Sequence, residues 1–143
     1  MFKRKQDVDK HISSILSRKR DEKERQAQGF QIARLYYDIK EYAIAKRYLS
    51  GFLNVRENAP TAHQLMGEIN ESLGEKEEAI ENYKRALNLA SYGSSNKQLV
   101  LKICELYCEQ GTDVERMKYW CDQCEKFYPK SDVVFKLKAQ IAE

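Results

Sequence analysis

The stretch GEKEEAIENYKRALNLA, residues 74–90, decides the fold of this chain. Gly74 is expected to end one helix, and a second helix is expected to begin two residues later. Gly67 lies seven residues before Gly74, in the first of these helices. One face of the second helix carries Ala79, Tyr83 and Ala86. The small residues allow two antiparallel helices to approach closely, and Tyr83 fills the gap between them.

This pattern resembles the second half of a tetratricopeptide repeat (TPR), a helix hairpin of about 34 residues that cannot bury its apolar face alone. The same register recurs without an insertion at residues 26–59, and again at residues 97–131 after a linker at Ser94, Ser95 and Asn96 and with one extra turn residue, Thr112. The motif positions hold Ala33, Tyr36, Ala45, Leu49 and Phe52 in the first copy, and Cys104, Tyr107, Gly111, Met117, Cys121, Cys124 and Pro129 in the third. We therefore predict an all-α fold, a TPR-like α-solenoid of three helix-hairpin repeats at about residues 26–59, 60–93 and 97–131.

An amphipathic helix is expected to flank the repeats at each end. Residues 1–25 form a basic N-terminal extension with nine Lys or Arg against five Asp or Glu, whereas the rest of the chain holds sixteen against seventeen, within a net charge of +3. Apolar side chains at helical spacing define the two flanking helices: Val8, Ile12, Ile15 and Leu16 in the first, and Val133 or Val134, Leu137 and Ile141 in the second, at residues 132–143. The charged run at residues 18–25 fits either a solvated linker or the start of the first repeat's helix.

The composition, 42% hydrophobic and 33% charged, is typical of a soluble helical domain. No apolar run approaches the roughly 20 residues that cross a bilayer, and no signal peptide is visible. We therefore expect no membrane insertion and a cytosolic or nuclear setting, in which the four cysteines stay reduced.

The cysteines have two interpretations. Cys104 with Cys108, and Cys121 with Cys124, have the spacing of one helix face, and four thiolates could bind zinc. However, Cys104, Cys121 and Cys124 occupy core positions of the repeat, and free cysteine is among the most buried residue types. Core packing is therefore favoured, and we predict no metal site and no redox role.

The sequence offers no support for catalysis. It contains no glycine-rich phosphate loop and no arrangement of Ser, His and Asp or of Cys and His that would activate a nucleophile. His11 and His63 are far apart in sequence, and His63 falls at a packing position of the second repeat. We predict a protein that is not an enzyme, without cofactor or small-molecule substrate.

TPR arrays commonly bind partners on the concave face formed by the first helix of each repeat. Here that face is predicted to carry Ala27, Phe30, Arg34, Tyr37 and Asp38, then Gln64, Glu68, Glu71 and Ser72, then Gln98, Leu101, Glu105 and Glu109. The basic clamp that grips chaperone C-termini needs Lys, Asn and Arg at offsets that hold Phe30, Leu65 and Glu68 here. The face becomes acidic in the later repeats, so it suits a basic or apolar segment, and the N-terminal helix is one candidate occupant.

A basic and aromatic cluster in the first repeat is a candidate RNA-binding or partner-binding site. Cations interleaved with aromatic rings can bind single-stranded RNA through phosphate contacts and base stacking. The candidate residues are Arg34, Tyr37, Lys40, Lys46 and Arg47. The alternative is that the neighbouring Tyr36, Tyr42 and Tyr48 pack between helices while the cations are solvated.

Six segments resemble one narrower family, the Ran-binding nucleoporins of the cytoplasmic filaments of the nuclear pore. They are DVDKHISSI, GFQIARLYYDIKEYAIAKRYL, NVRENAPTAHQLMGEI, QLVLKICELYC, MKYWCDQCEKFYPKS and FKLKAQI, in order from residue 7 to residue 141. The departures lie at residues 18–28 and 91–96. The resemblance implies an anchoring or docking domain on the cytoplasmic face of the nuclear pore, at the nuclear envelope, that serves transport of protein and messenger RNA.

Three functions follow in order of preference. The first is a structural interaction module whose partners are other nuclear pore proteins. The second is a module that binds single-stranded RNA, and the third is a general co-chaperone adaptor, which the missing clamp residues disfavour.

Overall fold

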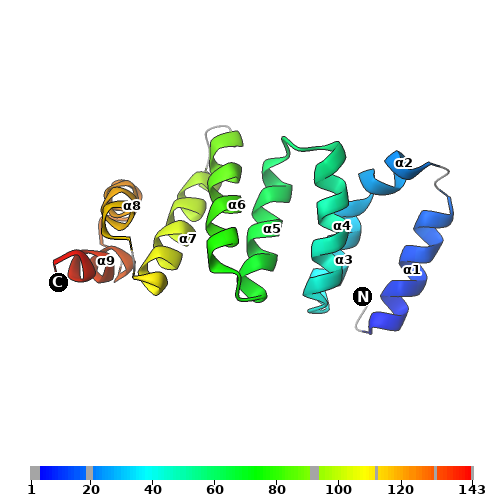
Figure 1. Cartoon of the computed structure of the whole chain (residues 1–143), viewed down its shortest axis with the longest axis horizontal. Helices are drawn as coiled ribbons and strands as arrows, with labels where there is room; N and C mark the ends of the chain where they lie inside the picture. Colours follow the sequence, from blue (N-terminus) through cyan, green and yellow to red (C-terminus); the bar gives the residue numbers. More distant parts are fainter. Residues whose placement is uncertain (1–3, 19–20, 91–93, 112, 131, 143) are drawn as a thin grey trace.

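The computed structural model describes residues 4–18, 21–90, 94–111, 113–130 and 132–142, and within these residues the chain is helical without a strand. The helices stand in a row along the long axis, with α1 at one end and α8 and α9 at the other (Figure 1). Their bounds are α1 Lys5–Ser17, α2 Glu22–Ala27, α3 Gly29–Asp38, α4 Tyr42–Val55, α5 Pro60–Ser72, α6 Lys76–Leu89, α7 Ser94–Gln110, α8 Val114–Phe127 and α9 Asp132–Ala142. Three pairs of consecutive helices pack against each other, α3 with α4, α5 with α6 and α7 with α8, and they confirm the predicted all-α, TPR-like solenoid.

Each helix pair turns at a residue with a positive φ angle. These residues are Lys40 (65°), Gly74 (78°) and Gly111 (62°). In the second pair, the N–H of Glu75 donates to the carbonyl oxygen of Asn70 at 2.8 Å, a bond that satisfies one of the last carbonyls of α5. The turn at Gly74 therefore ends α5 where the sequence predicted it, and α6 begins two residues later.

Close approach of the helices within a pair depends on missing side chains. A Cβ atom at Gly67 would lie 2.6 Å from Cε1 of Tyr83, which confirms that the Tyr83 ring fills the space beside this glycine. In the first repeat Ala33 and Ala45 are fully buried. Gly29 was not predicted as a contact point, yet a Cβ atom there would collide with the carbonyl oxygen of Tyr48.

The buried apolar side chains divide into two clusters at the boundary between α5 and α6. The N-terminal core comprises Val8, Ile12, Ile32, Ala33, Tyr36, Ala45, Leu49, Ala62, Leu65, Met66 and Ile69. The C-terminal core comprises Ala79, Ile80, Tyr83, Ala86, Leu99, Val100, Ile103, Cys104, Leu106, Tyr107, Met117, Trp120, Cys121, Cys124 and Val134. The boundary therefore runs through the middle repeat, and the flanking helices α1 and α9 each complete one core.

Two sequence expectations need correction. Ser94, Ser95 and Asn96 do not form a linker, because they lie in the first turn of α7. The run at residues 18–25 contains a separate short helix: the Asp21 side chain accepts a hydrogen bond from the N–H of Glu24 at 2.7 Å and starts α2. Thr112 and the side chains of Val133, Leu137 and Ile141 lie outside the described part of the chain.

The N-terminal helix covers one end of the array. Val8 and Ile12 are buried on α3, and the Tyr36 hydroxyl donates to Oδ1 of Asp9 at 2.5 Å. In Figure 1, α1 lies beyond α3 and far from α7. It therefore caps the first repeat and does not run along the faces of α5 and α7, where the predicted groove would be.

Candidate interaction surfaces

The five candidate binding residues do not form one patch. Arg34 and Lys40 are exposed, on α3 and on the turn after it, and Tyr37 is half-buried with its ring 5.6 Å from that of Tyr42. Arg34 lines a shallow pocket of about 340 Å³ together with Glu68 of α5. Arg34 therefore faces α5, on the inner face of the array.

Lys46 lies on another side of the array, between α4 and α6, and Arg47 is exposed on α4. The Lys46 ammonium lies 3.0 Å from both carboxylate oxygens of Glu75 and 3.3 Å from Glu78, and these carboxylates raise the pKa of Lys46. The Arg47 guanidinium lies 5.8 Å from the ring centre of Tyr48. The charge of Lys46 is thus largely compensated within the fold, whereas that of Arg47 is exposed to solvent.

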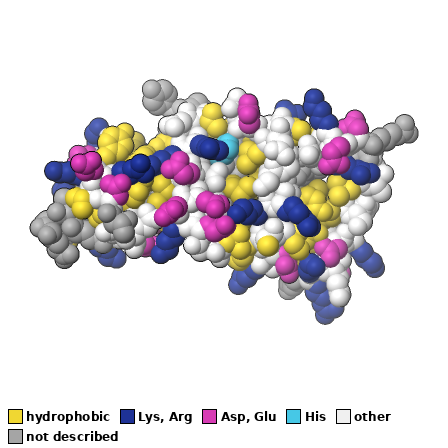
Figure 2. Space-filling view, viewed as in Figure 1, with side chains coloured by type: hydrophobic (Ala, Val, Ile, Leu, Met, Phe, Trp, Pro, Cys, Tyr) yellow, Lys and Arg dark blue, Asp and Glu magenta, His cyan; other side chains and the backbone are white. Residues whose placement is uncertain are grey.

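The aromatic rings of this region mostly pack between helices. Tyr36 is buried and stacks on Tyr48 with 5.7 Å between ring centres. Burial raises the pKa of Tyr36, and the hydrogen bond to Asp9 adds to this effect. On the face that Figure 2 shows, Lys and Arg side chains are interspersed with Asp and Glu, without a broad region of one sign.

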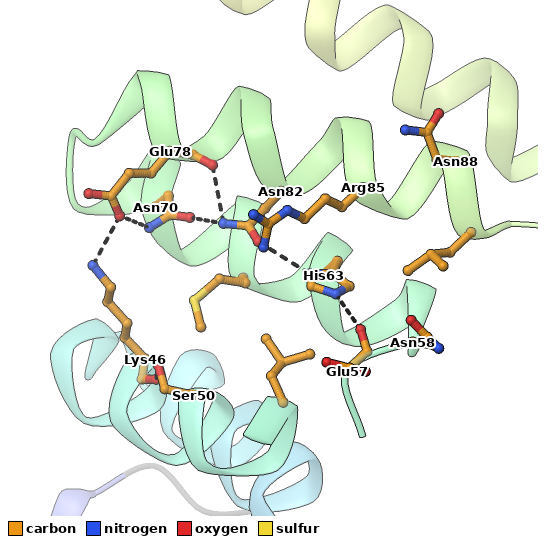
Figure 3. Close-up of a pocket in the computed structure, with 13 residues that line it drawn as sticks. Lys46, Ser50, Glu57, Asn58, His63, Asn70, Glu78, Asn82, Arg85 and Asn88 are labelled. Carbon is orange, nitrogen blue, oxygen red and sulfur yellow. Dashed lines mark hydrogen bonds and ion pairs between the residues drawn. The ribbon is translucent and has the colours of Figure 1, made fainter. Parts of the chain in front are cut away.

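A cavity of about 580 Å³ forms a groove on the outer face between α4 and α6, with α5 as its floor (Figure 3). Its apolar lining consists of Leu53, Met66 and Leu89. Its polar lining consists of Lys46, Ser50, Glu57, Asn58, His63, Asn70, Glu78, Asn82, Arg85 and Asn88. The groove therefore joins the second helices of the first two repeats.

A relay of polar side chains crosses this groove (Figure 3). Asn70 is fully buried; its amide donates to Glu75 at 3.2 Å and to Glu78 at 3.3 Å, and its oxygen accepts from the Asn82 amide at 2.9 Å. The Asn82 oxygen lies 3.3 Å from Nδ1 of His63, and Nε2 of His63 lies 2.8 Å from the carbonyl oxygen of Glu57. His63 is thus a hydrogen-bonded packing residue that ties the loop before α5 to α6.

The inner face carries carboxylates from α5 and α7. Glu71 pairs with Lys102 at 3.7 Å, and Glu109 pairs with Lys76 at 3.2 Å. Glu68 is half-buried, and burial raises its pKa against the opposing effects of Arg34 and Lys102. The predicted acidic character of this face is therefore partly neutralised by neighbouring lysines.

Three of the four cysteines are buried in the C-terminal core. The Cys104 thiol donates to the carbonyl oxygen of Trp120 at 3.0 Å, and burial raises the pKa of Cys104, Cys121 and Cys124. Within the described residues, no group of three or more His, Cys, Asp and Glu side chains is arranged to hold a metal ion. These thiols are held in the protonated form that packs well and reacts slowly.

The residues that sequence reasoning missed are amides. The sequence pattern did not single out Asn70 or Asn82, although a buried asparagine inside a helix is unusual unless its side chain is hydrogen-bonded. The occurrence of these asparagines inside predicted helices was the one signal in the sequence that could have revealed them. Their partners, which come from two helices and a turn, could not be read from spacing alone.

The structure and the comparisons agree on the class of protein. The hairpins define a TPR-like α-solenoid, and residues 60–92 match the family model described as tetratricopeptide repeat. Among the described residues, no helix combines the length and the apolar character that crossing a membrane requires.

Over its whole length the chain is homologous to the N-terminal region of RanBP2 and RanBP2-like proteins. It is 36% identical over 143 residues both to RANBP2-like and GRIP domain-containing protein 8 and to E3 SUMO-protein ligase RanBP2, both of Homo sapiens. It is 40% identical over 115 residues, 80% of the chain, to RANBP2-like and GRIP domain-containing protein 1 of Homo sapiens. The chain spans only 8%, 4% and 6% of the lengths of these three relatives.

Proposed function

We propose that this chain is a non-enzymatic interaction domain of a nuclear pore component. It anchors and docks other nuclear pore proteins on the cytoplasmic face of the pore, at the nuclear envelope, and so serves transport of protein and messenger RNA. The observation that carries this proposal is the whole-length similarity to RanBP2 in a chain that folds as a TPR-like solenoid. The outer groove and the inner face offer such partners a mixed polar and apolar surface.

The name of the RanBP2 relatives includes a SUMO-protein ligase activity, but this chain spans only 4% of their length. Three of its four thiols are buried and have raised pKa values, which suits packing better than covalent chemistry. The role that we propose for this region is therefore binding.

The proposal is tested by localisation. A fluorescent fusion of the whole chain, expressed in cultured cells, is expected to enrich at the nuclear rim, and proximity labelling from the fusion should mark pore scaffold proteins. The control is Gly67→Arg, whose side chain collides with Tyr83 and opens the α5–α6 hairpin. A diffuse wild-type signal, or rim enrichment that survives in the control, would contradict the proposal.

A second candidate is binding of single-stranded RNA through Arg34, Tyr37, Lys40, Lys46 and Arg47. The exposure of Arg34, Lys40 and Arg47 favours it. Titration with an RNA oligonucleotide over a range of salt concentrations tests it, because phosphate contacts weaken steeply as salt rises. Arg47→Gln should reduce the salt slope by about one phosphate contact, while Lys46→Gln should change it less because Lys46 is already paired. Absence of binding at low salt would remove this candidate.

The third alternative, a co-chaperone adaptor, remains disfavoured. Phe30, Leu65 and Glu68 stand at the clamp offsets, and none of these three side chains donates a hydrogen bond to a carboxylate. The pocket that they line holds one cation, Arg34, beside the carboxylate of Glu68. A peptide that ends in an acidic chaperone C-terminus should therefore not bind, and measurable binding would revive this alternative.

A further inference from the structure

The outer groove between α4 and α6 has room for a ligand and polar groups that the relay does not use. Its cavity of about 580 Å³ falls in the range of about 300–1,000 Å³ that ligand pockets occupy. Asn58, Arg85 and Asn88 line it, are exposed and stand outside the relay of polar side chains (Figure 3). Their donors and acceptors are therefore accessible to a partner.

The floor of the groove is already fixed by the relay. The Asn70 amide donates to Glu75 and to Glu78. The Asn82 amide donates to Asn70 and, at 3.1 Å, to the carbonyl oxygen of Glu78. With two acceptors for the two amide hydrogens of each asparagine, neither has a donor left for a ligand. A partner would therefore bind to a preformed floor, which lowers the cost of binding.

The charges that line the groove are balanced. Two cations, Lys46 and Arg85, accompany two carboxylates, Glu57 and Glu78. An acidic segment would meet Glu57 and Glu78, and a basic segment would meet the two cations. Like charges brought together at an interface cost affinity. The groove therefore favours an uncharged segment.

The length of the groove and its exposed amides suit an extended chain. The α6 lining runs from Glu78 to Leu89, a rise of about 16 Å along the helix, which about five residues of extended chain would cover. An extended segment leaves its main-chain N–H and carbonyl groups unpaired, whereas a helix bonds most of them internally. An asparagine side chain offers both a donor and an acceptor, which is the pairing that a peptide group needs.

The apolar part of the lining receives one side chain from each helix. These are Leu53 of α4, Met66 of α5 and Leu89 of α6. Met66 is buried, and a methionine side chain adapts to irregular shapes. Leu89 is 39% exposed, and an apolar side chain of a partner would remove more of it from water. The segment is therefore expected to carry one bulky apolar side chain.

We infer that the outer groove binds an extended, uncharged segment of a protein partner that carries one bulky apolar side chain. The main chain of this segment bonds to Asn58, Arg85 and Asn88, and its apolar side chain packs on Leu89. The site deepens the proposed function and rests on it, since it specifies the segment that the interaction domain recognises.

The test uses the whole chain and a phage-displayed library of random hexapeptides. Peptides selected on the wild-type chain should share one bulky apolar position and carry no excess of either charge. A selected peptide, labelled with fluorescein, then gives affinities by anisotropy. Leu89→Ser should weaken binding about tenfold through lost apolar contact, and Asn88→Ala about fivefold through the loss of one hydrogen bond.

Leu73→Ser and Asn54→Ala are the matched controls. Leu73 is 39% exposed, as Leu89 is, and Asn54 is an exposed amide of α4. Neither of them lines the groove. Both controls should bind the peptide as wild type does, and all four variants should melt close to wild type because the substituted side chains are exposed.

A selection that enriches no peptide, or that enriches acidic or basic peptides, would overturn the assignment. Unchanged affinity in the groove variants or an equal loss in the controls would do the same. A dimer in sedimentation that Leu89→Ser dissolves would assign the groove to a second copy of this chain instead. Because the assay needs no pore, its failure alongside preserved nuclear-rim enrichment would leave the proposed function standing.

Discussion

At the scale of single residues, the repeat is defined by where a side chain is absent. Gly74 and Gly51 differ in whether the position requires glycine. Gly74 has a φ of 78°, and a Cβ atom added there would meet no atom within 4 Å. Gly51 lies inside α4, where the nearest neighbour of an added Cβ atom would be Cγ of Gln26 at 3.7 Å. The first glycine is required by backbone conformation, and the second is not.

The same substitution should therefore have opposite effects at these positions. Gly74→Ala should lower the free energy of unfolding by about 1–2 kcal/mol, the cost of a left-handed conformation for a residue with a Cβ atom. Gly51→Ala should raise it by up to about 1 kcal/mol, because alanine favours the helix interior. Urea unfolding of both variants measures the two changes in unfolding free energy. Changes of the same sign would contradict this account of the turn.

Glu68 gives a pH-dependent prediction at the same scale. Burial raises its pKa above the ordinary value of 4.5, so the folded state prefers the protonated form. The stabilisation from this preference is complete at pH values below the pKa of Glu68 in the unfolded chain. It is lost as pH rises through the higher pKa that Glu68 has in the folded chain. Glu68→Gln should thus melt at a higher temperature than wild type at pH 7 and at the same temperature near pH 4. A constant difference across this range would show that the effect does not come from ionisation.

At the scale of elements, polar contacts fix how α4 and α6 lie on α5. Asn70 bonds to side chains at residues 75, 78 and 82, and Lys46 of α4 reaches the first two of them. The helices themselves were predictable, because period and turn residues are local properties. The relay of polar side chains between them was not predictable, because it depends on which side chains meet after the helices pack.

Asn70→Ala tests this relay. It removes three hydrogen bonds, so that the Asn82 amide and the carboxylates of Glu75 and Glu78 each lose one partner from a buried position, at an expected cost of about 2 kcal/mol in unfolding free energy. Asn88→Ala, an exposed amide on α6 that lines the same groove, should change stability by less than about 0.5 kcal/mol. Equal losses in chemical denaturation would mean that the relay contributes nothing specific.

At the scale of the whole molecule, the two apolar cores imply separable stability. In a solenoid each repeat contacts mainly its neighbours, so a loss of stability in one repeat is not shared equally along the array. The boundary between the cores lies between α5 and α6, and the relay of polar side chains at Asn70 crosses it. The N-terminal and C-terminal halves should therefore respond differently to a core substitution.

Ile103→Ala removes a fully buried side chain of the C-terminal core, at an expected cost of about 2–5 kcal/mol. Hydrogen exchange should accelerate in α7, α8 and α9 while α1, α3 and α4 keep most of their protection. Ile32→Ala, equally buried in the N-terminal core, is the reciprocal control and should give the opposite pattern. Uniform acceleration along the chain in both variants would indicate a single cooperative unit.

By itself, the sequence determined the helical period, the turn at Gly74, the close approach at Gly67, the core positions of the cysteines and the similarity to Ran-binding nucleoporins. All of these depend on residue identities at fixed spacing. Only the tertiary structure decided that Arg34 and Lys46 line different cavities, that α1 caps the array, and that the buried Tyr83 hydroxyl has no hydrogen-bond partner among the described residues. The physical reason is that helical periodicity fixes the direction of a side chain relative to its own helix, whereas its partners depend on how the helices pack against one another.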